Sequence, residues 1–233
     1  IKKDGLVENG SITDPRLNYD LTNPQDPHLL IEPASTNYAI NSNNASSWNN
    51  ITQNGTVTAT ANHSTAPDGT QTATRLQMSV NGTGFALKGV SVFGLTGNYA
   101  STVYLKTTSG NTQNVCMSGR NTPNAVFSVT GEWQRFEING NTTSGLSAYF
   151  NVGVYTSFSG ASNPIDILVW GGQLEFGDYA TSFIPTTSSA VQRTEDYISS
   201  SYTGLSSASG TIFIDLDTKG LDSNYSKIIA LRD

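Results

Sequence analysis

The sequence predicts an all-β protein whose main folded unit is an antiparallel β-sandwich or jelly roll. Two observations support this prediction. Short runs of β-branched or alternating apolar residues recur about every ten to fifteen positions, and Gly- and Asn-rich turns separate them. No window places apolar residues at helical spacing. Strands that follow one another without intervening helices favour an antiparallel sandwich over βαβ units.

The clearest strand candidates are Gly84–Phe93, Tyr99–Thr107, Asn114–Ser118, Trp133–Ile138, Ala148–Tyr155 and Ile165–Leu174. Good turn residues lie between such runs, for example Asn81-Gly82 and Ser109-Gly110. The alternating pattern begins at Leu29 and closes at Pro185, so we expect residues 29–188 to form the sandwich.

The two flanks differ from this central part. Residues 1–28 contain three prolines among Asp and Asn, which is typical of an extended leader that drapes over another surface. Thr186–Gln192 is a Ser/Thr-rich hinge, and a new strand is expected at Thr211–Leu216. Because an isolated strand or two is only marginally stable, residues 189–233 are expected to be a hinge and the first strands of a second, truncated β domain.

Composition excludes several functional classes. The net charge is -6 and no Lys or Arg run occurs, so the basic patch that nucleic-acid binding requires is missing. No apolar stretch approaches the roughly 20 residues that span a membrane, and we expect no membrane insertion. Charged residues make up only 13% of the chain. The lone Cys116 forms no disulfide framework and is expected to be a buried small hydrophobe.

No catalytic pattern is visible. His28 and His63 are the only histidines, and both lie in Pro- or Asn-rich surroundings. The motifs of serine hydrolases, zinc proteases and phosphate-binding loops are absent. Glycoside hydrolysis needs two facing carboxylates, and nothing in the sequence marks such a pair. We therefore expect a protein that is not an enzyme.

A structural calcium ion is one expectation. Calcium binds carboxylate, amide and backbone oxygens, which loops at sandwich edges supply. The candidate ligands are Glu32, Asn41, Asp166 and Asp178. An alternative, which the sequence favours, is that Asp166 caps a strand start and Glu32 forms a surface ion pair.

Sugar binding by a sandwich uses aromatic rings as flat platforms, with hydrogen-bond donors beside them. Tyr104 and Tyr155 alternate with apolar strand neighbours, so we expect both to project from a sheet face. Lys106 shares the face of Tyr104, and Arg120 follows the end of the next strand. These four residues form a candidate site for an acidic or hydroxyl-rich polysaccharide. Alternatively, both tyrosines pack against the leader or a neighbouring chain. Trp170 lies in a nearly continuous apolar run and is expected to be structural.

Several motifs, taken in order, resemble a known family. They are Asp14-Pro15-Arg16-Leu17-Asn18-Tyr19, Leu29-Leu30-Ile31-Glu32-Pro33-Ala34-Ser35-Thr36-Asn37, Ser47-Trp48, Ala66-Pro67-Asp68-Gly69-Thr70, Ala73-Thr74-Arg75-Leu76 and the closing stretch from Trp170 to Thr186. This order resembles the carbohydrate-binding-module-like jelly rolls of phage tail fibre, tail spike and baseplate-associated proteins. Within the closing stretch, the resemblance implies sheet-edge and turn roles for Gln173 and Glu175. Residues 210–233 are similar to the first strands of a lectin-like sandwich.

The resemblance implies a receptor-binding or adhesion component of a phage tail that binds host surface polysaccharide. Its partners would be that carbohydrate and other virion proteins. Because single sugar contacts are weak, several copies would act together, as in a homotrimeric fibre. Two alternatives stay open. The chain could be a binding module of a secreted, extracellular polysaccharide-degrading enzyme, or a structural virion spacer that binds no sugar.

Overall fold

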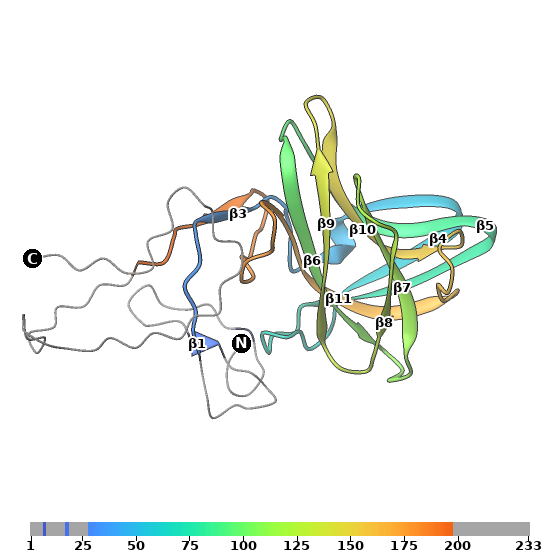
Figure 1. The fold of residues 1–233 in the computed structure, drawn as a ribbon. Helices are drawn as coiled ribbons and strands as arrows, with labels where there is room; N and C mark the ends of the chain where they lie inside the picture. The colour runs from blue at the N-terminus through green and yellow to red at the C-terminus, as the bar shows by residue number, and fades with distance from the viewer. Residues whose placement is uncertain (1–6, 8–16, 19–27, 198–233) are drawn as a thin grey trace, which may run out of the picture. The chain divides into compact units, whose positions relative to one another are not determined.

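The computed structural model describes Val7, Leu17–Asn18 and residues 28–197. Its elements are β1 (Leu17–Asn18), β2 (His28–Leu29), β3 (Ser35–Asn37), the 3₁₀ helix η1 (Ala45–Ser47), β4 (Asn49–Ser64), β5 (Ala73–Phe93), β6 (Gly97–Thr107), β7 (Gln113–Gly119), β8 (Ala125–Val129), β9 (Gln134–Thr142), β10 (Ser147–Tyr155), β11 (Ile165–Phe176) and β12 (Val191–Arg193) (Figure 1). Within this part of the chain, no helix is long and apolar enough to cross a bilayer.

The predicted antiparallel sandwich is confirmed. Its strands run in the order β8-β7-β10-β5-β11-β6-β9, and β4 pairs along β5. The first half of β5 pairs with β11, and its second half pairs with β10. The long strand therefore belongs to both sheets. We call the sheet around β10, with β7 and β8, the β10 layer, and the sheet around β11, with β6 and β9, the β11 layer.

The passage of β5 from one layer to the other occurs where the sequence predicted a turn at Asn81-Gly82. That prediction was wrong, because the residues belong to one continuous strand. The register with β4 shifts here, between Gln53 and Gly55. Gly82 and Asn54 have positive φ angles of 74° and 54°, and the Asn54 amide donates to the carbonyl of Thr83. The turn-forming residues thus build a β-bulge, which bends the hairpin without ending it.

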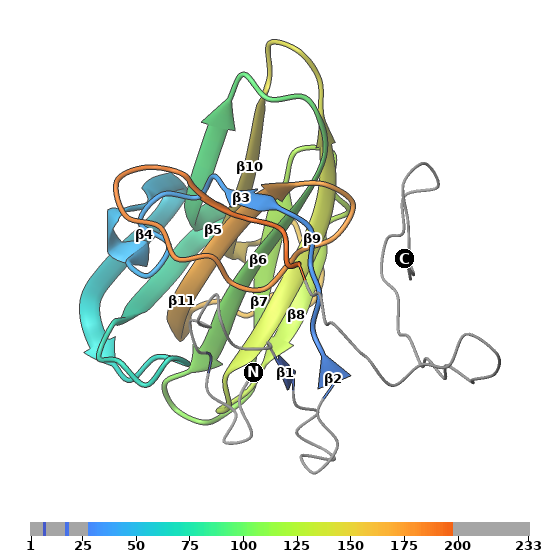
Figure 2. The same cartoon turned by 90° about the vertical axis from the view of Figure 1, so that its left-hand side faces the viewer.

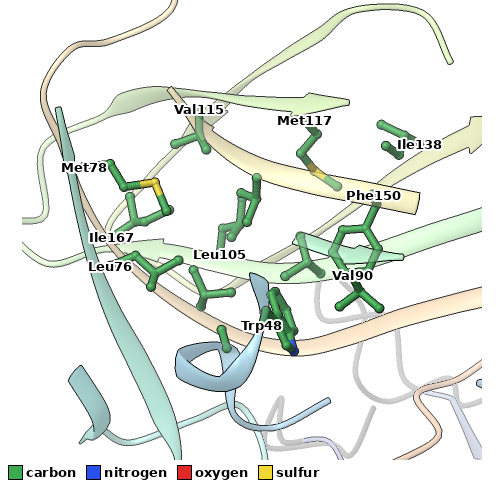
Figure 3. Packing of buried hydrophobic residues seen from close by; sticks show 14 of the residues in the cluster. Trp48, Leu76, Met78, Val90, Leu105, Val115, Met117, Ile138, Phe150 and Ile167 are labelled. Carbon is green, nitrogen blue, oxygen red and sulfur yellow. The ribbon is translucent and has the colours of Figure 1, made fainter. Parts of the chain in front are cut away.

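The hydrophobic core lies between the two layers (Figure 3). Period-two alternation along β10 sends every second side chain into it, as the sequence predicted. Trp48 packs at one side of the core, with its ring edge-on to Phe150 at 5.5 Å between centroids. Lys88 also points inward and is 3% exposed; its Nζ donates to the carbonyls of Ser46 and Trp48. Burial lowers the pKa of Lys88.

A closing segment, residues 179–186, crosses the outer face of the β11 layer, as the orange ribbon of Figure 2 shows. Gln173 and Glu175 of β11 form hydrogen bonds to this segment. Gln173 donates to the carbonyls of Thr181 and Ser182, and the carboxylate of Glu175 accepts the backbone N–H of Thr181. The resemblance implied sheet-edge and turn roles for these two residues. That was wrong, because β11 is a central strand and both side chains are buried.

The boundary of the sandwich lies beyond the predicted residue 188. β12 falls partly within the predicted hinge, yet it pairs with β3. Arg193 forms an ion pair with Glu32 at 2.6 Å, and the compact unit extends to Asp196. The expected strand at Thr211–Leu216 and the expected lectin-like domain lie outside the described residues.

Candidate functional site

The outer faces of the two layers differ in how far they are covered. On the β11 layer, Trp170 and Tyr104 are 1% and 8% exposed, because Phe183 of the closing segment, Ala66 and Val7 pack against them. On the β10 layer, by contrast, the outward residues Asn49, Gln53 and Ser91 are exposed, whereas Leu87 and Asn151 nearer the centre are buried. We call this outer surface of the β10 layer the open face.

The strand register fixes the arrangement of side chains on the open face. Asn49, Gly89, Asn151 and Ser118 are register partners in turn, on four neighbouring strands. This row is about 14 Å long, since three strand spacings of roughly 4.8 Å separate its ends. Gly89 has no side chain, and the amide of the neighbouring Asn151 occupies the space above it. The row therefore crosses four neighbouring strands.

Aromatic rings gather at one end of the open face. Tyr155 stacks on Phe158 with ring centroids 4.8 Å apart and planes at 16°, and Phe85 lies 5.3 Å from Tyr155. Tyr155 and Phe85 are half-buried, whereas Phe158 is buried. Cys116 is also buried, as predicted, and its burial raises the pKa of the thiol. This end supplies apolar ring surface for stacking.

A cation lies at the other end, where Arg120 follows β7. Its guanidinium carbon lies 5.3 Å from the centroid of the Tyr149 ring. The Arg120 Nε donates to the carbonyl of Ser147 at 2.6 Å, which fixes the side chain in place. The backbone is held as well, because the buried hydroxyl of Tyr99 donates to the Arg120 carbonyl. Burial raises the pKa of Tyr99 to about 12, so this donor keeps its proton at neutral pH.

Asn151 lies between the two ends. It is 8% exposed, and its Oδ1 is buried with no hydrogen-bond partner among the described residues. A Cβ at Gly89 would meet this oxygen at 1.9 Å, so the Asn151 amide fills the space above that glycine. A buried polar atom without a partner is costly, which makes it a marker of strain or of a missing ligand.

The structure separates the four predicted sugar-binding residues. Tyr155 does project from a sheet face, as expected, and so does Tyr104. The expected solvent exposure of Tyr104 was wrong: its ring lies edge-on to Trp170, with centroids 5.5 Å apart, under the closing segment. Val7 belongs to the same cluster, so the alternative of packing against the leader holds for Tyr104. Lys106 lies on this covered layer, whereas Arg120 and Tyr155 lie at opposite ends of β10.

The four candidate calcium ligands have other partners. Asp166 accepts hydrogen bonds from Arg75 and Gln77, and Glu32 accepts one from Arg193. Asp178 accepts the side-chain amide of Asn98, and the carbonyl of Asn41 accepts the indole N–H of Trp48. Among the described residues, no three His, Cys, Asp or Glu side chains are grouped to hold a metal ion. Calcium binding stays a prediction that the geometry does not support.

A depression on the β11 layer, near its junction with β5, is a second candidate besides the open face. We call it the second depression. It encloses about 450 Å³ and is lined by Thr56, Thr58, Gln77, Met78, Ser79, Gln113, Pro164, Ile165 and Asp166. Its side chains largely satisfy one another: Thr56 bonds Ser79, and Gln77 bonds Asp166. It contains no aromatic ring. The open face is the better candidate, because it combines rings, a cation and an amide oxygen without a described hydrogen-bond partner.

The strands of the open face contain no carboxylate. Asp and Glu are absent from β4, β7, β8, β10 and the second half of β5. Hydrolysis of a glycosidic bond uses a pair of carboxylic acids, so these strands do not supply that chemistry. What the face offers is ring stacking, amide hydrogen bonds and one guanidinium. These groups can stack on a ring and form hydrogen bonds.

Sequence reasoning missed Tyr149 and Asn151 as site residues, although the signal was present. Alternation along β10 placed Tyr155 opposite Val152. The same rule places Tyr149 and Asn151 on the side of Tyr155.

No protein-family model and no curated protein matches the sequence. Among solved structures, the chain is similar to the CBM22-1 xylan-binding domain of Paenibacillus barcinonensis Xyn10C (14% identity, 62% of this chain, 94% of that chain, TM-score 0.40). It is also similar to a family 11 carbohydrate-binding module of Clostridium thermocellum (9% identity, 64% of this chain, 100% of that chain, TM-score 0.43). A third similar structure is the enzymatically active domain of tailspike protein 4 of bacteriophage CBA120 (18% identity, 59% of this chain, 21% of that chain, TM-score 0.39). With TM-scores below 0.5, no functional residue is transferred from them.

Proposed function

We propose that this chain is a non-catalytic carbohydrate-binding protein and that the open face holds its ligand. The observation that carries the proposal is the arrangement along β10, where half-buried rings at both ends flank the amide of Asn151. Rings stack on sugar faces, and amides exchange hydrogen bonds with hydroxyl groups. The absence of carboxylates from these strands supports binding without hydrolysis.

We further propose that the chain acts in adhesion at a phage tail, as a receptor-binding component in the virion. The order of motifs from Asp14 to Thr186 supports this assignment, and a homotrimer would raise the avidity of weak sugar contacts. The experiment is a comparison of bacterial strains with and without their surface polysaccharide. The full chain should bind only the strains that carry it. Sedimentation equilibrium should show three copies.

A glycan array probed with the full chain tests sugar binding itself, and two matched variants locate the site. Ser91→Trp places a bulky side chain on the open face beside Tyr149, its register partner. Thr58→Trp places the same side chain on the outer face of the β11 layer, at the second depression. Both positions are exposed, so both variants should fold normally.

We expect Ser91→Trp to abolish glycan binding and Thr58→Trp to leave it unchanged. The reverse result would assign the ligand to the second depression. An array without any bound glycan would refute the proposal and favour a structural spacer.

A further inference from the structure

The open face has an unusual charge distribution for a protein of net charge -6. Its strands carry no Asp or Glu, and the cation of Lys88 is turned inward to backbone carbonyls. Arg120 follows β7 at the border of this face. Its guanidinium therefore lies beside Tyr149, next to strands that carry no carboxylate.

The guanidinium of Arg120 is held in place but is not neutralised. Two other described arginines pair with carboxylates, Arg75 with Asp166 and Arg193 with Glu32. Arg120 forms no such ion pair with a described residue. Its Nε is committed to the carbonyl of Ser147, which leaves the terminal N–H groups to other partners. A guanidinium fork that is fixed in this way is well suited to an anionic group, which it binds through two parallel hydrogen bonds.

The second observation is the amide of Asn151, two residues along β10 from Tyr149 on the same face. The separation of the two Cα atoms is about 7 Å, at roughly 3.3 Å per residue. More than nine-tenths of Asn151 is buried, and its Oδ1 has no described partner. The amide torsion is broad, so the group can turn its oxygen or its NH₂ toward a ligand. A cation and an unsatisfied amide are therefore neighbours on one face.

We infer that the open face recognises an acidic polysaccharide, with Arg120 binding the anionic group of one sugar and Asn151 a hydroxyl group of that sugar or the next. This inference rests on the proposed sugar-binding function and adds the class of sugar. The shared chemistry is an anion carried on a sugar ring, and carboxylate, sulfate and phosphate all fit a guanidinium fork. Nucleic acid does not fit, because the net charge of the chain is -6.

The test begins with a glycan array that contains neutral, carboxylated, sulfated and phosphorylated glycans, probed with the full chain. The glycans bound should be acidic, and the array distinguishes the three anions. Polygalacturonate and its carboxyl-reduced form serve as a matched pair for the carboxylate. Poly-L-glutamate carries carboxylates without sugar rings and should not bind.

Three charge variants, and the variant Asn151→Ala, are measured on the acidic glycan that binds best. Arg120→Gln should weaken binding about tenfold or more, since a charge-assisted hydrogen bond is lost. Arg120→Lys keeps the charge without the fork and should fall between Arg120→Gln and the unchanged chain. Lys106→Gln removes one positive charge from the covered layer, and binding should stay within about twofold, as is usual for a charge far from the ligand.

Asn151→Ala separates recognition from folding. Removing a buried polar group that has no partner should leave the melting temperature unchanged or raised, while glycan binding weakens. A lower melting temperature with unchanged binding would show that Asn151 is structural. The inference is overturned if the bound glycans are neutral, or if Arg120→Gln and Lys106→Gln bind equally well. An array without bound glycans refutes the sugar-binding function itself, which is a separate outcome.

Discussion

Gln173 donates its side-chain amide to the carboxylate of Glu175 at 2.7 Å, and both residues are buried under the closing segment. Glu175 accepts further hydrogen bonds from Ser35 and from both the backbone and the hydroxyl of Thr181. In this way a polar pair on a central strand joins the two ends of the sandwich sequence, near residues 35 and 181. The closing motif therefore stabilises the fold, and the groups that we propose to bind the ligand lie on the other layer.

The Glu175 contacts predict a difference between two substitutions. Glu175→Ala removes the carboxylate that accepts four hydrogen bonds and should lower the free energy of unfolding by about 3 kcal/mol. Glu175→Gln should cost about 1 kcal/mol, because one amide oxygen can still accept from the two N–H donors and the two hydroxyls can reorient. Urea unfolding of the full chain measures both values. Equal losses would mean that the hydrogen bonds do not hold the closing segment.

The covered cluster predicts that Trp170 and Tyr104 act in stability. Trp170→Ala should cost about 3–5 kcal/mol, and Tyr104→Ala about 3 kcal/mol, as expected when a buried aromatic ring is removed. Tyr104→Phe keeps the ring and should stay within about 1 kcal/mol of the unchanged chain. Thermal and urea unfolding provide the measurements. If Tyr104→Ala melted normally and lost glycan binding, the sequence-based site would be correct after all.

Alternation was the most informative sequence signal. It predicted six strands that the structure confirms and the side of the sheet on which Tyr104 and Tyr155 lie. It missed β4, whose outward positions are mostly Thr, Asn and Gln and whose inward positions include the small residue Ala59. An edge strand with so little apolar content is similar to a polar loop in sequence. The short strand β8 was missed as well.

The exposure of a face could not be read from alternation. Tyr104 is covered by residues near 66 and 183, which are distant in the sequence. Whether an outward side chain meets solvent or another segment depends on such tertiary contacts. The candidate site therefore loses Tyr104 and Lys106 and keeps Arg120 and Tyr155 on the β10 layer, although the sheet faces of Tyr104 and Tyr155 were predicted correctly.

The ion pair between Arg75 and Asp166 predicts a pH dependence of stability. Hydrogen bonds from Arg75 hold the pKa of Asp166 below its ordinary value of 3.8. A carboxylate with a lowered folded pKa stabilises the fold above the unfolded value, and this contribution is lost as the pH falls through the folded value. Asp166→Asn should therefore melt below the unchanged chain at pH 7. The two melting temperatures should converge as the pH falls below 3.8. A constant difference down to acid pH would contradict this role.

The pairing of β12 with β3 predicts where the sandwich can be shortened. A fragment of residues 28–196 keeps that pairing and the Arg193–Glu32 ion pair, whereas a fragment of residues 28–188 lacks both. Both fragments should fold with all-β circular dichroism, because the core strands β4 to β11 are intact. The shorter one should be less stable by roughly 1–3 kcal/mol, since it loses several backbone hydrogen bonds and a partly buried ion pair.

Arg193→Ala in the longer fragment is the matched control, because it removes the ion pair and keeps the strand. Its loss of stability should be smaller than that of the shorter fragment. Urea unfolding followed by tryptophan fluorescence compares the three chains, since Trp48 and Trp170 are both buried. If the fragment of residues 28–188 were as stable as the fragment of residues 28–196, β12 would add nothing to the sandwich and the sequence-based boundary at residue 188 would stand.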